Sequence, residues 1–123
     1  MSLRVRVHVE PSDIHDMGIF AGERIPRGGI VWRFDPEVDT VIREKPMGVL
    51  ADWSWREEDC WVVPGDDARF MNHSFAPSVH SHGSRHVDDV AARDIEVGEE
   101  LTVDYSLFDL DWPTYAHLYK RDA

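Results

Sequence analysis

Short apolar segments, each closed by glycine, proline or a charged run, are the feature that most restricts what this chain can fold into. Segment 3–9 alternates apolar and polar residues, which is the pattern of a half-buried β-strand. Further short candidate strands occur at residues 18–21, 30–35, 38–42, 60–63 and 101–104, and residues 78–82 and 85–92 are the expected arms of a hairpin around Gly83 and Ser84. Many short strands joined by tight turns predict a mainly β fold with few short helices.

Two segments predict those helices. Pro46 can begin a helix that carries Leu50, Trp53 and Trp55 and ends in the charged residues 56–59. Near the C-terminus, residues 111–119 begin with a candidate N-cap aspartate and have a proline just inside the helix.

One strand-and-turn unit occurs twice with the same spacing. It has an alanine at a strand end, a buried isoleucine and a turn glycine, at positions 21, 25 and 28 and again at 91, 95 and 98. The two copies predict a repeated structural unit within the β fold.

The length of 123 residues suits one domain over residues 1–123. No apolar segment is long enough to span a membrane, and the first residues lack a signal-peptide core, so we expect a soluble, unexported protein without a membrane partner. Cys60 is the only cysteine, which fits a reducing cytoplasm and excludes an internal disulfide and a cysteine-rich zinc site.

The chain is acidic, with 24 acidic and 13 basic residues and a net charge of −11. This balance argues against a nucleic-acid partner, which requires a basic face. Two interpretations of the acidity remain. Either the acidic surface attracts a partner rich in lysine and arginine, or the acidic residues only keep the surface solvated.

Three segments contain residue types that can take part in chemistry: MGIFA at 17–21, RFMNHSFAP at 69–77 and GEELTVDY at 98–105. Each has a structural interpretation when taken alone. A glycine before a strand serves a turn, an Asn-His-Ser sequence near a proline bonds its own backbone, and a tyrosine at a strand end packs against the core.

In this order and spacing the three segments resemble the SET-domain family, over roughly residues 5–105. The resemblance implies a β-clip of short strands with a C-terminal pseudoknot, in a minimal form without pre-SET or Cys-rich post-SET segments. It also implies a methyltransferase that uses S-adenosylmethionine to methylate a lysine side chain of a protein.

The resemblance implies roles for particular residues. Tyr105 corresponds to the catalytic tyrosine, and with Val103 it lines the lysine channel. Cofactor binding falls to the backbone at Met17 and Gly18, the Asn72 side chain, the His73 backbone and the aromatic rings of Phe108 and Trp112. Arg69 is expected to brace the fold through a buried carboxylate such as Asp104.

The chain departs from the family pattern at three positions. Asp16 stands where a glycine is usual, and aspartate tolerates left-handed backbone better than most residues. Phe75 replaces a usual cysteine and Ser78 a usual asparagine. These changes leave a second interpretation open, a non-catalytic SET-like module that binds a peptide or S-adenosylmethionine.

The substrate is expected to be a lysine in a basic, flexible segment of another protein. Acidic clusters at residues 57–59, 66–67 and 109–111 would form the groove that binds it. The sequence leaves the oligomeric state open, with a dimer as one option.

A third interpretation is a metal-binding β protein, built on a hairpin that carries His80, His82 and His86. We favour a polar hairpin face without a metal.

Overall fold

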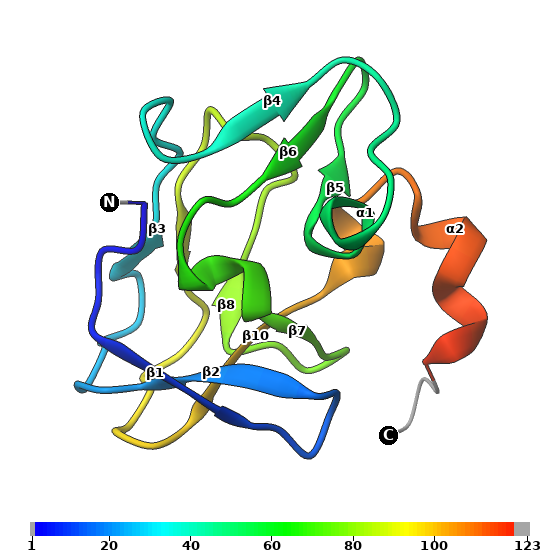
Figure 1. Cartoon of the computed structure of the whole chain (residues 1–123). Helices are drawn as coiled ribbons and strands as arrows, with labels where there is room; N and C mark the ends of the chain where they lie inside the picture. Colours follow the sequence, from blue (N-terminus) through cyan, green and yellow to red (C-terminus); the bar gives the residue numbers. More distant parts are fainter. Residues whose placement is uncertain (1, 120–123) are drawn as a thin grey trace.

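The computed structural model describes residues 2–119, and its strands form three small sheets (Figure 1). The first sheet has the order β1 (Val7–Pro11), β2 (Met17–Ala21), β10 (Glu100–Val103) and β7 (Asn72–His73). The second has the order β3 (Ile30–Trp32), β9 (Asp89–Ala91) and β8 (Val79–His80). The third has the order β4 (Thr40–Ile42), β6 (Trp61–Val63) and β5 (Trp55–Arg56).

The helices are short, as expected, and the prediction of a mainly β fold is confirmed. They are α1 (Val49–Trp53), η1 (Asp67–Phe70), η2 (Tyr105–Leu107), α2 (Trp112–Tyr115) and η3 (Ala116–Leu118). Within residues 2–119, no helix has the length and apolar character needed to cross a bilayer.

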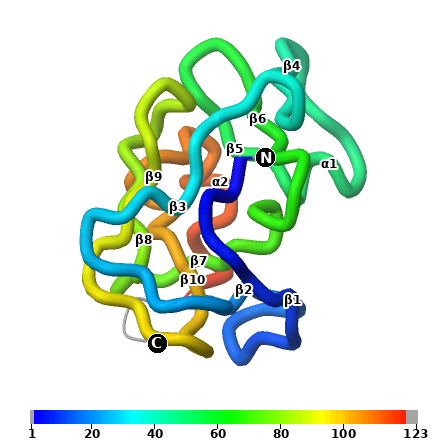
Figure 2. The backbone as a smooth tube through the Cα atoms, turned by 90° about the vertical axis from the view of Figure 1, so that its left-hand side faces the viewer, coloured from blue at the N-terminus to red at the C-terminus, as the bar shows by residue number. Residues whose placement is uncertain are grey.

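Sheet β4-β6-β5 and helix α1 lie at one end of the molecule, and strands β1 and β2 lie at the other (Figure 1). Strands β7 and β10 and helix η1 lie between them, and α2 runs along one side. In the perpendicular view, β3, β8 and β9 occupy the flank opposite α1 (Figure 2). The buried core joins these parts and consists of Leu3, Ile19, Ala21, Ile25, Val31, Trp32, Met71, Val79, Ala91, Ile95, Leu101 and Val103.

The first strand begins later than the alternation predicts. Leu3 forms an isolated bridge to Trp32, and the ladder with β2 starts at Val7. Val7 and Val9 are half-buried while His8 between them is exposed, so the alternation does set the face of the strand.

The helix predicted from Pro46 is shorter than expected. It comprises only Val49–Trp53, and Trp55 belongs to strand β5, where it pairs with Val62. Apolar residues spaced two apart fit a strand as well as a helix, and pairing with β6 decides between the two.

Strand β10 brings the three motif segments into one sheet. It pairs with β2 on one side, with Leu101 opposite Ile19. On the other side it runs parallel to β7, with Thr102 opposite Asn72 and Val103 opposite His73. The expectation that these segments lie together is confirmed.

Candidate functional site

A cavity of about 670 Å³ opens where the motif segments meet. Its wall includes Met17 of β2, Asn72 of β7, Val103 of β10 and Tyr105 of η2. Helix η1 and the segment from α1 to β5 supply much of the remaining wall. The volume is in the range of small-molecule sites in proteins.

Asn72 fixes the turn between β1 and β2. Its side-chain amide donates to the carbonyl oxygens of His15 (3.1 Å) and Met17 (3.0 Å) and to Glu100 Oε2 (3.0 Å). The Ser12 hydroxyl also donates to the Glu100 carboxylate, at 2.8 Å. The turn that forms one rim of the cavity is therefore bonded to β7 and β10.

Gly18 lies directly against these same groups. A Cβ atom at this position would lie 2.4 Å from Glu100 Oε2, which is too short for a real contact, and 3.1 Å from Asn72 Nδ2, so the Glu100 carboxylate would have to move away from Asn72. Gly18 is buried and lies outside the cavity wall, whereas its neighbour Met17 lines the cavity. Asp16, the residue before Met17, adopts the left-handed φ of 44° that its side chain was expected to tolerate.

Tyr105 is held at the cavity by two hydrogen bonds. Its hydroxyl donates to the Met71 carbonyl oxygen at 2.5 Å, and its backbone N–H donates to His73 Nδ1 at 3.0 Å. Burial raises the pKa of Tyr105 well above its ordinary value of 10, so the hydroxyl keeps its proton. Because that proton goes to Met71, the lone pairs of the oxygen remain available to an incoming donor.

His73 supports Tyr105 from behind. Burial lowers the pKa of its imidazole below the ordinary 6.5, although Asp104 at 3.8 Å opposes the change. The neutral ring accepts from Tyr105 at Nδ1 and therefore carries its proton on Nε2, which is buried without a partner among residues 2–119. The backbone of β7 at His73 is committed to the ladder with β10.

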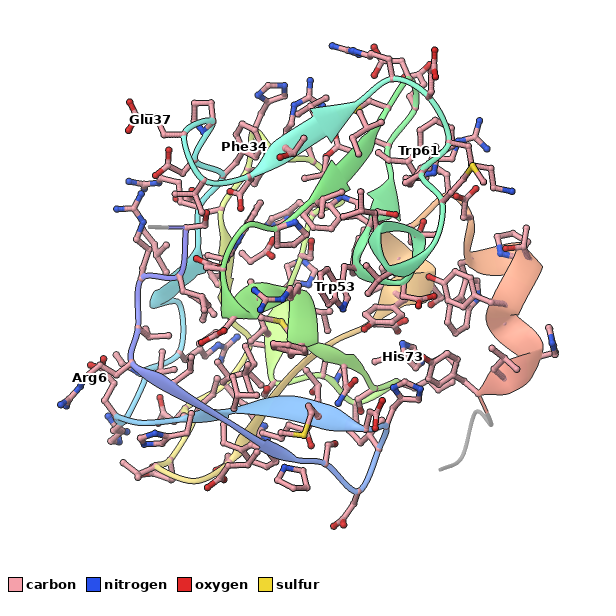
Figure 3. All side chains as sticks on the ribbon, viewed as in Figure 1. Arg6, Phe34, Glu37, Trp53, Trp61 and His73 are labelled. Atoms are coloured by element: carbon pink, nitrogen blue, oxygen red, sulfur yellow. The ribbon has the colours of Figure 1, made fainter. Side chains whose placement is uncertain are left out.

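Phe108 and Trp112, both expected near the cofactor, occupy different environments. Phe108 lines the cavity and packs edge-on against Tyr105 and Trp55, each at 5.9 Å between ring centroids. Trp112 lies outside the cavity wall. It stacks on Tyr119 at 5.6 Å and contacts His73 at 4.8 Å, and Figure 3 shows His73 directed toward the C-terminal helices.

The expected brace between Arg69 and Asp104 is not formed. The guanidinium of Arg69 lies 5.0 Å from the ring centre of Trp53 and 4.5 Å from that of Phe70, and donates to the Asp66 carbonyl oxygen. Asp104 caps the turn at Ser106, accepting from its backbone N–H at 2.9 Å. Two aromatic rings and a local carbonyl hold the Arg69 guanidinium in place of a distant carboxylate, and its buried Nε has no partner among residues 2–119.

The other two departures from the family pattern, Phe75 and Ser78, have structural roles. Phe75 packs edge-on against His73 at 4.3 Å. The Ser78 hydroxyl donates to the Glu100 carbonyl oxygen and accepts from the Thr102 N–H, both at 3.0 Å, which ties its segment to β10. Neither residue lines the cavity.

The acidic clusters, by contrast, bond mostly within the protein. Glu57 pairs with Arg85 at 2.7 Å and Asp59 with Arg43 at 2.7 Å. Asp109 accepts from Tyr115, and Asp111 accepts from the Trp61 indole, so the candidate N-cap of α2 makes no side-chain cap bond. An acidic groove on the outer surface stays a prediction.

Sequence reasoning missed two acidic residues of the cavity wall, Asp52 and Asp89. Asp89 on β9 lines the cavity, and burial raises its pKa to about 7. The pattern that points to it is its place two residues before buried Ala91, which puts an acid on the inward face of a strand.

The histidine hairpin forms as β8 and β9, with His80 opposite Val90. The rings of His80 and His82 lie 4.5 Å apart, centre to centre. Among residues 2–119, no group of three or more His, Cys, Asp or Glu side chains converges in the manner of a metal site.

Comparison with known proteins connects this arrangement to one family. Residues 16–106 match the SET domain family. The chain is 33% identical over 119 residues to an H3 lysine-4 specific histone-lysine N-methyltransferase of Schizosaccharomyces pombe, a match that covers 81% of this chain and 13% of that protein. It is 32% identical to histone-lysine N-methyltransferase set1 of Dictyostelium discoideum, covering 85% of this chain and 8% of that protein.

Two further matches agree. Human histone-lysine N-methyltransferase 2B is 36% identical over 114 residues, covering 80% of this chain and 4% of that protein. The chain therefore spans about an eighth or less of the length of these three curated relatives. The crystal structure of a candidate histone methyltransferase from Plasmodium falciparum superposes with a TM-score of 0.61 at 17% identity, covering 84% of this chain and 95% of that one, which supports the fold.

Proposed function

The chain belongs to the SET-domain family, and from this membership we propose that it transfers a methyl group from S-adenosylmethionine to a lysine side chain of another protein. The observation that carries the proposal is the environment of Tyr105. Tyr105 lines the cavity, and its hydroxyl keeps its proton and uses it on the Met71 carbonyl oxygen. An oxygen held in this way can accept a hydrogen bond from a substrate amine without acting as a base.

The cavity residues fit S-adenosylmethionine. Arg69 lines the cavity, and its buried Nε has no partner among residues 2–119, so a carboxylate finds a charged donor there. Asp16, Asp52 and Asp109 also line the cavity and favour a positively charged ligand. When bound, S-adenosylmethionine supplies a methyl group that its sulfonium charge has already activated.

The cofactor contacts implied by the resemblance divide into two sets. Met17, Asn72 and Phe108 stand in the cavity wall and are proposed to contact the cofactor directly. Gly18, His73 and Trp112 lie behind that wall and are proposed to hold its shape. Val103 and Tyr105 remain the proposed walls of the lysine channel.

The protein's main task toward the substrate is to orient an amine and keep it neutral. A free lysine has a pKa about three units above neutrality, so deprotonation at pH 7 costs about 4 kcal/mol. Two unit positive charges about 4 Å apart repel by about 4 kcal/mol at an effective dielectric of 20. A cationic cofactor and burial both favour the neutral amine, which the Tyr105 oxygen then orients.

The rival interpretation, a non-catalytic module, is based on the departures from the family pattern at Phe75 and Ser78. Both residues pack or bond inside the fold and leave the cavity wall unchanged. Because Tyr105 retains its supports as well, we favour the enzyme.

The proposed substrate class is a lysine in a basic, flexible protein segment, in a cytoplasmic setting. The histone-lysine methyltransferase relatives support a protein lysine. The acidic residues of the cavity wall support basic flanks.

The test is transfer of labelled methyl groups from S-adenosylmethionine to basic lysine peptides. The wild-type protein is expected to label the peptide, and the same peptide with arginine in place of lysine is expected to stay unlabelled. Cofactor binding without labelling of any lysine peptide would instead favour the non-catalytic module.

A further inference from the structure

The Glu100 carboxylate lies behind the rim of the cavity and outside its wall. Its Oε2 accepts from Asn72 Nδ2 at 3.0 Å, and its two oxygens accept from the Ser12 hydroxyl at 2.8 Å and 2.9 Å. A Cβ atom placed on Gly18 would lie 2.4 Å from Oε2, so the carboxylate also lies against the backbone of β2. Among residues 2–119 it forms no ion pair, so the donors that hold it are neutral.

The partners of Asn72 fix the direction of its side-chain amide. Nδ2 faces three acceptors, which are Glu100 Oε2 and the carbonyl oxygens of His15 and Met17. Because only the nitrogen of an amide donates, Oδ1 is the opposite end of the group. Within residues 2–119 every Asn72 side-chain bond runs through Nδ2, and Oδ1 is not among the buried atoms that lack a partner. Since Asn72 lines the cavity, Oδ1 is the acceptor that it offers to a ligand there.

Glu100 is the strongest of the three acceptors around Nδ2. The nitrogen carries two hydrogens for these three oxygens, and a hydrogen bond to an ionised group is about twice as strong as one between neutral groups. Donation to a carboxylate also polarises the amide, which makes Oδ1 a better acceptor. Glu100 therefore both orients the Asn72 amide and strengthens the atom that faces the cavity.

Ser12 holds the carboxylate in this position. Its hydroxyl donates to Glu100 and accepts from the Ile14 N–H at 3.0 Å, and its own N–H donates to the Asp16 carbonyl oxygen at 2.8 Å. Glu100 is thus fixed to the turn that carries residues 15–17 into the cavity wall.

We propose that Glu100 is a positioning residue for cofactor binding, which orients the Asn72 amide so that Oδ1 accepts an N–H or O–H of S-adenosylmethionine. This role rests on the proposed function. Glu100 acts through Asn72, because it lies outside the cavity wall itself. A change at Glu100 should therefore alter cofactor affinity more than methyl transfer, since Tyr105 is bonded to Met71 and His73 instead.

The first measurement is the affinity of the whole protein for S-adenosylmethionine by calorimetry. Glu100→Met fills a similar volume without an acceptor and is expected to weaken binding about tenfold, whereas Glu100→Gln keeps one acceptor oxygen and is expected to stay within about threefold of the wild type. Glu99→Gln is the matched control, since the Glu99 side chain pairs with Arg93, and it is expected to bind as the wild type does. Equal affinity of the wild type and Glu100→Met would overturn the proposal.

The second measurement tests whether Glu100 acts through Asn72. In an Asn72→Ala background, Glu100→Met is expected to cost about threefold or less in further affinity, because the amide that it orients is absent. In transfer assays the KM for S-adenosylmethionine should rise in Glu100→Met, with kcat at saturating cofactor within about threefold of the wild type. Losses of affinity that multiply in the double variant would show that Glu100 acts independently and would overturn the role.

The third measurement uses the protein without cofactor. Solvent exchange of the Asn72 side-chain amide hydrogens, followed by NMR, is expected to be about fivefold faster in Glu100→Met and close to wild type in Glu100→Gln. Unchanged exchange in Glu100→Met would show that Glu100 does not hold the amide and would overturn the proposal. A wild type that binds S-adenosylmethionine but transfers no methyl would refute the proposed function alone, and one that binds no S-adenosylmethionine would refute both.

Discussion

Ile25 and Ile95 exchange both of their backbone hydrogen bonds, at 2.9 Å and 2.8 Å, and both side chains are fully buried. The relationship extends symmetrically on either side. The Gly28 N–H donates to the Ala91 carbonyl oxygen at 2.9 Å, and the Gly98 N–H donates to that of Ala21 at 2.8 Å. The repeated strand-and-turn unit expected from sequence spacing is therefore two copies that pair with each other about the isoleucines.

The turn glycines of this pair should be about equally sensitive to substitution. Gly28 and Gly98 have φ values of 83° and 89°, and no atom lies within 4 Å of a Cβ placed at either position. Gly28→Ala and Gly98→Ala are each expected to lower the free energy of unfolding by about 1–2 kcal/mol through backbone strain alone. Urea unfolding measures the loss. Gly98→Asn should cost less than Gly98→Ala despite its size, and the reverse order would contradict this explanation.

The parts of the structure that depend on local pattern could be predicted from the sequence. Strand alternation, turn glycines and the meeting of the motif segments follow from residue periodicity and from the family resemblance. Arg69 could not be placed, because its partners are the Trp53 ring and a backbone carbonyl, neither of which has a sequence pattern. Asp89 was missed because an acidic residue in a short strand is ordinarily assigned to the solvent face.

Asp16 is expected to tolerate glycine and reject branched residues. Its φ of 44° is a left-handed conformation that glycine adopts freely. Asp16→Gly should leave stability within about 1 kcal/mol of the wild type, whereas Asp16→Val should lose about 1–2 kcal/mol. Thermal and urea unfolding check both variants. An Asp16→Val protein as stable as Asp16→Gly would show that the turn rearranges at no cost.

Near neutral pH, Asn72→Asp is expected to lower the free energy of unfolding more than Asn72→Ala does. All three partners of its amide nitrogen are acceptors: two carbonyl oxygens and Glu100 Oε2. Asn72→Ala removes the donor from the two carbonyl oxygens and leaves Glu100 only its bond from Ser12, and it should lose about 1–3 kcal/mol of stability and about tenfold in affinity for S-adenosylmethionine. Asn72→Asp adds like-charge repulsion, which should diminish as the pH falls and the new carboxyl is protonated. Unfolding at two pH values, with calorimetry for the cofactor, measures both effects.

Tyr105→Phe should keep the fold and lose methyl transfer. The change removes one hydroxyl, leaves the Met71 carbonyl without its donor, and should cost about 1–3 kcal/mol of stability. Transfer is expected to fall at least tenfold with cofactor affinity unchanged. Tyr115→Phe is the matched control, since that hydroxyl donates to Asp109 and has no proposed contact with the amine. Similar rates for the two variants would make Tyr105 a packing residue.

The pH dependence of stability should separate Asp89 from its neighbour Asp88. The folded-state pKa of Asp89 is about 7, above the unfolded 3.8, so its stabilising contribution is present below about pH 4 and is lost as the pH rises through 7. Asp89→Asn should therefore match the wild type near pH 4 and be more stable near pH 8, by at most about 4 kcal/mol.

Arg33 lowers the pKa of Asp88, so the contribution of that ion pair is present above pH 3.8 and lost below it, and Asp88→Asn should be less stable than the wild type near pH 8. Burial lowers the pKa of His73 from 6.5, so its protonation destabilises the fold as the pH falls below 6.5. This effect is the same in the wild type and both variants. The difference in free energy of unfolding between variant and wild type at each pH therefore does not contain it. Urea unfolding of the three proteins across this range gives those differences, and a loss of stability in Asp89→Asn near pH 8 would show that its carboxyl is not strained by burial.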